Sequence, residues 1–218
     1  MPRIRLAPLS RNAPLDVARW AQAPTSGARH RAMRHDTYRG FLPSGHEPAR
    51  DFAIYRNAML AYDIFPATRM EKKINSADGR IQLDAVIVQR AFVGPFALEM
   101  AVRVTEIIDE PHRFGFVYET LEGHAERGRE RFLMREDPGG FTMVIEAWST
   151  PGWLVARSVA PFSRFVQKRA TREALEHMET TLERAKLAAA SSPASPKASG
   201  GLRPTEPTAR SERSERSP

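Results

Sequence analysis

The feature that most constrains the fold is a regular alternation of inward and outward positions between Arg113 and Ser149. Three short runs carry it: Phe114, Phe116 and Tyr118, then Glu130, Phe132 and Met134, then Phe141, Met143 and Ile145. A period of two is typical of strands that bury one face. Turn sequences such as Asp137–Gly140 separate the runs, so the pattern predicts consecutive antiparallel strands.

Further elements flank these strands. A fourth run with the same period contains Leu98, Met100, Val102 and Val104, and residues 81–90 form another candidate strand. Apolar residues of 51–65 recur at helical spacing, with Asp51 as the expected N-cap. After the strands, an apolar seam from Phe162 to Ala185 predicts one long helix of about 25 residues. The order of helix, antiparallel sheet and long helix indicates an α+β fold.

The ends of the chain differ in composition from the middle. Residues 189–218 consist mainly of Ser, Pro, Ala, Gly and charged residues, which cannot bury enough apolar surface to fold. Residues 1–45 are rich in Arg and weakly patterned, and a short helix around Trp20 is interpreted as a loosely attached surface segment. We therefore predict a basic, weakly ordered N-terminal segment at 1–45, one domain at 46–188 and a disordered tail at 189–218.

The net charge of +7 is concentrated at the two ends. Residues 1–50 carry +6 and residues 51–189 carry −1, so no nucleic-acid site is expected on the folded domain. The absence of Cys excludes disulfides and thiol chemistry, and the six His show no metal-ligand spacing, so neither metal nor cofactor is expected. No apolar run is long enough to span a membrane and no secretory signal pattern is present, which favours a cytoplasmic protein.

A family resemblance rests on the motif from Gly115 to Phe132 and on residues of the last strand. The matching positions are Gly115-Phe116, Tyr118, Thr120-Leu121, Gly123-His124, Glu126, Gly128, Glu130 and Phe132, with Ala147, Ser149, Pro151, Pro161 and Gln167 further on. In these residues the chain resembles the domain of unknown function nineteen-ninety family of bacteria and plants. It departs from the family pattern at Glu119, Glu122, Ala125, Arg129 and Thr150.

The resemblance implies a fold and a place for a ligand, but no reaction. The family is similar to the helix-grip (START-like) superfamily, which includes lipid-transfer domains and polyketide cyclases. In that fold a curved antiparallel sheet wraps around a long C-terminal helix, and a ligand cavity lies between sheet and helix.

Two residues stand out as candidates for a site. His124 follows a Gly in the loop between two strands, where it can cap the loop or lie at a cavity mouth and bind a ligand. Glu130 shares its strand parity with Phe132, so it is expected to point inward, where a carboxyl needs a partner such as Tyr118, His124 or Arg103. A satisfied structural acid and an acid–base group are both consistent with this position.

Three functions are compatible with the sequence. The first is a non-catalytic domain that binds a small hydrophobic or lipid-like ligand through Met100, Val102, Phe116, Tyr118, His124, Glu130, Phe132, Met143 and Phe165. The second is an enzyme of cyclase or hydratase type with Glu130, Tyr118 and His124 as acid–base groups. The third is an adaptor whose basic N-terminal segment binds an anionic partner. We favour the first; oligomeric state and ligand identity are not predicted.

Overall fold

The computed structural model describes residues 5–8, 14–27, 33–93, 96–151 and 160–191. Its centre is an eight-stranded antiparallel sheet in the order β2-β8-β7-β6-β5-β4-β3, with β1 pairing with the start of β5. The strand bounds are β1 Arg5–Pro8, β2 Arg34–Pro43, β3 Met70–Ile74, β4 Val86–Val93, β5 Phe96–Glu110, β6 Arg113–Thr120, β7 Glu126–Asp137 and β8 Gly140–Pro151. The sheet therefore contains the predicted meander and extends it on both sides.

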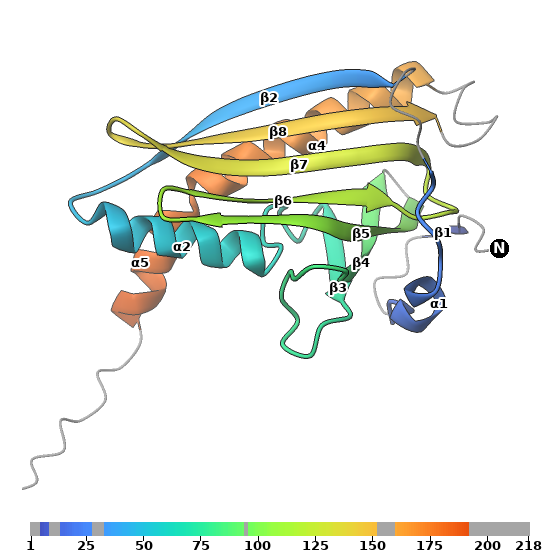
Figure 1. Cartoon of the computed structure of the whole chain (residues 1–218), viewed down its shortest axis with the longest axis horizontal. Coiled ribbons are helices and arrows are strands. Elements are labelled where there is room, and N and C mark those ends of the chain that lie inside the picture. The colour runs from blue at the N-terminus through green and yellow to red at the C-terminus, as the bar shows by residue number, and fades with distance from the viewer. Residues whose placement is uncertain (1–4, 9–13, 28–32, 94–95, 152–159, 192–218) are drawn as a thin grey trace, which may run out of the picture.

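In the described ranges the sheet is accompanied by four helices: α1 Val17–Ala21, α2 Pro48–Leu60, α4 Ala160–Glu179 and α5 Thr181–Ser191. In Figure 1, α4 runs behind β7 and β8, and α2 and α5 lie together at one end of the sheet. Gly40 on β2 allows the close approach of α4, because a Cβ there would lie 3.0 Å from the Leu175 side chain. A curved antiparallel sheet gripping a C-terminal helix confirms the predicted α+β helix-grip fold.

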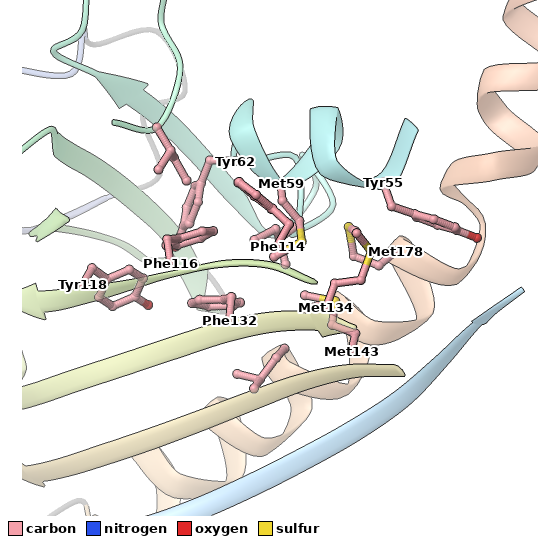
Figure 2. Packing of buried hydrophobic residues seen from close by; sticks show 14 of the residues in the cluster. Tyr55, Met59, Tyr62, Phe114, Phe116, Tyr118, Phe132, Met134, Met143 and Met178 are labelled. Carbon is pink, nitrogen blue, oxygen red and sulfur yellow. The ribbon is translucent and has the colours of Figure 1, made fainter. Parts of the chain in front are cut away.

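The main core lies between the inner face of the sheet and helices α2 and α4. Figure 2 shows how aromatic and methionine side chains from these elements interlock. Phe116 and Phe132 form a stacked cross-strand pair with ring centroids 5.1 Å apart, and Tyr62 from the end of α2 packs edge-on against Phe132. Such pairs contribute about 1 kcal/mol beyond their buried area. The predicted strand parity is therefore confirmed in the core.

The start of α2 differs from its prediction. Glu47 is the N-cap residue, and Pro48 occupies the first turn, where its fixed φ and missing N–H are tolerated. Asp51, the predicted N-cap, lies inside that turn and is buried. Its carboxylate accepts hydrogen bonds from the Ser44 hydroxyl and the Gly45 backbone N–H. Asp51 thus ties the β2–α2 connection to the helix instead of capping it.

The predicted single C-terminal helix is divided into two. Helix α4 ends at Glu179 and α5 begins at Thr181. The hydroxyls of Thr180 and Thr181 both donate to the carbonyl of His177. Threonine side chains that hydrogen-bond to the preceding turn compete with the helical backbone, which accounts for the interruption.

A second, smaller core lies on the outer face of the sheet. Trp20 of α1 is fully buried there against a group of small apolar residues: Val86, Val88, Ala101 and Leu121. The interpretation of this helix as a loose surface segment is therefore wrong. Together with β2, which pairs along its whole length with β8, it shows that the sheet and its covering extend N-terminally of residue 46. Residues 192–218 of the proposed tail lie outside the described residues.

Arg103, one of the partners expected for Glu130, does not lie on the inner face with it. It lies opposite Glu119 on the outer face. Its guanidinium donates to the backbone carbonyls of Ala21 and Ala23, beneath the N-terminal segment. The sequence around Trp20 is too weakly patterned to show that this segment covers the sheet.

Candidate functional site

The candidate site is built on a cross-strand pair of polar residues on the inner face. Tyr118 of β6 lies directly opposite Glu130 of β7, and its hydroxyl donates a short hydrogen bond to Glu130 Oε2. A β-bulge in β5 lies beside this pair, where the register shifts between Val104 and Glu106. Bulges redirect side chains and are common next to binding sites.

A buried hydrogen-bond chain leads to this pair from the opposite side of the core. The Gln89 side-chain amide on β4 donates to the Tyr62 hydroxyl at 2.7 Å. The hydroxyls of Tyr62 and Tyr118 are themselves hydrogen-bonded. Tyr62 adopts φ +51°, an uncommon value for an aromatic residue, immediately after α2. This left-handed turn carries its ring into the sheet–helix core.

Burial controls the ionisation of the groups in the chain. Removal from water raises the pKa of Glu130 to about 7, with a further increase from the nearby charge of Glu126, while the Tyr118 hydrogen bond opposes it. Burial and the Glu130 carboxylate raise the pKa of Tyr118 and of Tyr62 well above the usual value. The two tyrosines therefore stay protonated as donors, whereas Glu130 changes charge near neutral pH.

The carboxyl of Glu130 is only partly satisfied. Tyr118 occupies Oε2, and Oε1 has no hydrogen-bond partner within the described part of the chain. Among the described residues, the side-chain atoms that are both fully buried and without a hydrogen-bond partner are Arg103 Nε and Arg129 Nε. Oε1 of Glu130 is not one of them, so it retains some contact with solvent. The residue as a whole is half-buried, while its neighbours Phe116 and Phe132 have no accessible surface. Glu130 thus stands at the rim of the packed core with one oxygen free.

His124 lies in the loop before β7 and does not join the pair. Gly123 supplies the positive φ of +91° that the turn requires, and His124 Nδ1 accepts from the Glu126 backbone N–H at 3.0 Å. Burial lowers the pKa of His124 to about 4, so its ring is neutral at physiological pH. In the described residues no hydrogen bond, ion pair or ring contact joins it to Tyr118 or Glu130. The geometry is that of a loop-capping histidine. Its Nε2 has no hydrogen-bond partner among the described residues.

The other predicted ligand-binding residues occupy different depths. Four of them are fully buried in the main core: Val102, Phe116, Phe132 and Met143. Met100 is half-buried and lies opposite Gln89, so it shares the inner face at the Glu130 end. The side chain of Phe165 lies outside the described residues. The first four residues therefore build the core, whereas Met100 retains accessible surface.

Sequence reasoning did not identify Tyr62 and Gln89 as parts of the site. Tyr62 was assigned to the apolar stripe of a helix, and Gln89 lies in an otherwise apolar strand. A lone amide on the buried face of a strand could have served as a signal, because it requires an internal partner. The identity of that partner depends on the packing of α2 against the sheet.

Within the described ranges, no group of three or more His, Asp or Glu is arranged to hold a metal ion. None of the helices described there has the length and apolar character needed to cross a membrane.

The fold and the inner-face site define the chain as a helix-grip protein of the α+β class. It belongs to the family described as Domain of unknown function (DUF1990), whose model matches residues 17–177. It is also similar to a UPF0548 protein of Deinococcus radiodurans, with 45% identity over 69 residues. That alignment covers 31% of this chain and 31% of the Deinococcus protein.

Solved structures with similar folds have little sequence in common with this chain. A hypothetical protein from Helicobacter pylori has 8% identity and a TM-score of 0.51, covering 80% of this chain and 98% of that one. The di-domain ARO/CYC StfQ from the steffimycin biosynthetic pathway has 8% identity and a TM-score of 0.50, covering 71% of this chain and 52% of StfQ. At such identities the likeness shows the fold alone.

Proposed function

We propose that the protein binds a small, mainly apolar ligand on the inner face of the sheet, at the end where Tyr118 and Glu130 meet. The observation that carries this proposal is the free, accessible Oε1 of Glu130 beside a wall of aromatic rings. Ligand sites are typically apolar with a few polar groups that set orientation. A carboxyl that is crowded by apolar groups and still accessible is costly for folding alone, which favours a role in binding.

The surroundings of Glu130 favour a ligand with a flat apolar body. Tyr118 and Phe132 pack with ring centroids 5.6 Å apart, and Ala147 is the cross-strand neighbour of Glu130 on β8. Aromatic rings on one side of Glu130 and the small side chain of Ala147 on the other support binding through apolar contacts.

An enzyme of acid–base type is a second candidate. Its support is the pKa of about 7 for Glu130 beside the protonated hydroxyl of Tyr118, because a catalytic acid or base works best near the ambient pH. His124, the third residue expected to take part, hydrogen-bonds within its own loop. The binding role is favoured because Glu130 and Tyr118 converge without His124, the third group expected for acid–base catalysis.

Native mass spectrometry of the freshly purified full chain tests the binding role. We expect a bound small molecule that is lost after organic extraction and rebinds unchanged. Ala147→Leu should abolish rebinding by placing a larger side chain next to Glu130, whereas Ala188→Leu on the exposed part of α5 should not. Recovery of a converted molecule would favour the enzyme, and a wild-type chain that binds neither its extract nor 2-naphthol would refute the proposal.

A further inference from the structure

The hydrogen-bond chain that ends at Glu130 has a direction. Gln89 donates its amide hydrogen to the Tyr62 oxygen, and a hydrogen bond links the Tyr62 and Tyr118 hydroxyls. Tyr118 in turn gives its single hydrogen to Glu130 Oε2. Each tyrosine hydroxyl has one hydrogen and can also accept. The Tyr118 hydrogen is therefore committed to the carboxylate and is not available to a ligand.

This direction determines what the site can recognise. We propose that Glu130, when ionised, anchors the ligand by accepting a hydrogen bond at Oε1, so that the site then selects apolar molecules carrying a hydroxyl or similar donor group. The inference rests on the proposed binding function and adds the chemical class of ligand. A ligand carbonyl or ether at the same place would direct its lone pairs at those of the carboxylate and leave both unpaired. Leaving a buried polar group unpaired discriminates strongly between ligands.

The three residues behind Glu130 act as positioning residues. Burial keeps both tyrosines protonated, so their donors persist when Glu130 is ionised. Tyr62 is held in a left-handed conformation after α2, and Gln89 is itself buried on β4. A strained backbone in an aromatic residue persists only where the surrounding structure imposes it. The chain therefore holds Oε2 on Tyr118 and leaves Oε1 facing the accessible side.

A matched pair of probes tests this selection: 2-naphthol, which carries a hydroxyl, and 2-methoxynaphthalene, which has the same rings without a donor. Their affinities for the full chain are measured by fluorescence titration at pH 8, where a carboxyl of pKa about 7 is mostly ionised. We expect wild type to bind 2-naphthol about tenfold more tightly, the usual effect of a hydrogen bond to a charged group.

Substitutions in the chain give distinct outcomes. In Glu130→Gln the amide oxygen must accept from Tyr118, so the NH₂ group takes the place of Oε1 and the preference should reverse toward 2-methoxynaphthalene. Tyr62→Phe should reduce the preference by about twofold to threefold while leaving the affinity for 2-methoxynaphthalene unchanged, which a loss of packing would not do. Met178→Leu, in the core away from the chain, should keep the wild-type preference.

The failures of the two proposals are distinguishable. If wild type binds both probes with equal affinity, or if Glu130→Gln keeps the preference for 2-naphthol, the donor anchor is wrong although a binding site exists. If wild type binds neither probe, the proposed binding function itself is contradicted. The comparison within wild type needs no substitution, so poor folding of a variant does not prevent a decision.

Discussion

The two ends of the inner face belong to the same sheet and follow the same strand alternation, but they differ in burial and polarity. At one end, Phe114, Met134, Met143 and Met178 have no accessible surface and pack against Met59 of α2 (Figure 2). We call this the closed end. At the other, the Glu130 end, Tyr118, Met100 and Glu130 retain accessible surface and surround a polar chain.

The difference indicates that the two ends of the same strands have different roles. Flexible methionines fill the closed end without polar atoms, which is efficient packing. At the Glu130 end a carboxyl, two hydroxyls and an amide lie among aromatic rings, and each needs a partner to offset its desolvation. Polar groups can add specificity at the expense of stability. We therefore expect the closed end to supply stability, and the proposed function places recognition at the Glu130 end.

The largest expected effect comes from truncating matched methionines at the two ends. Met134→Ala removes a fully buried side chain and should lower the free energy of unfolding by about 3 kcal/mol. Met100→Ala, on the same face but half-buried, should lower it by less than about 1 kcal/mol. Urea unfolding measures both. Equal losses would remove the distinction between the ends.

A somewhat smaller effect is expected from Glu130→Gln, and it depends on pH. The folded-state pKa of Glu130 is about 7, above its usual 4.5, so ionisation destabilises the fold. This penalty is absent below pH 4.5, grows between pH 4.5 and 7 and is complete above pH 7. Glu130→Gln should therefore be more stable than wild type at pH 8.5, by about 2 kcal/mol after allowance for partial exposure.

The difference in unfolding free energy between wild type and Glu130→Gln, measured across pH 4 to 8.5, isolates this group from other titrations. If Glu130→Gln is more stable than wild type at pH 8.5 and this difference disappears toward pH 4, the result supports a Glu130 that serves recognition at the cost of stability. A variant that is less stable than wild type at pH 8.5 would show that Glu130 is a stabilising structural acid.

Removing a tyrosine hydroxyl at each end should change the stability by an equal or smaller amount. Tyr62→Phe leaves the buried Gln89 amide without its acceptor and should lower stability by about 2 kcal/mol. Tyr55→Phe removes a hydroxyl that donates to the partly exposed Pro43 carbonyl, which water can then reach, and should lower it by about 1 kcal/mol. Thermal denaturation at one pH compares the two variants. A larger loss of stability in Tyr55→Phe than in Tyr62→Phe would contradict a buried hydrogen-bond chain through Tyr62.

Local periodicity was sufficient to predict the centre of the fold and part of the site. Strand parity placed Glu130 on the inner face with Phe132, and the pairing with Tyr118 follows from consecutive strands. The remaining partners depend on contacts between distant segments. Tyr62 reaches Glu130 through the packing of α2 on the sheet, and Gln89 belongs to a strand two positions away from β6.

The N-terminal elements were missed for a different reason. The apolar alternation of strand β2 is weak in the sequence, because Asp36 and Gly40 lie on its inner side and Phe41 lies on its exposed side. Its place at the sheet edge depends on pairing with β8, more than 90 residues later. Trp20 is a single large side chain in a short helix, and one residue does not establish a periodicity.

Methyl NMR of the methionines tests the central claim most directly. The chain is labelled with ¹³C-methyl methionine and titrated with 2-naphthol at pH 8. The account predicts that the Met100 signal shifts saturably, because it lies on the inner face at the Glu130 end. The signals of Met59, Met134, Met143 and Met178 should stay in place. Shifts confined to those four, with Met100 unmoved, would contradict the claim that the ligand binds beside Glu130.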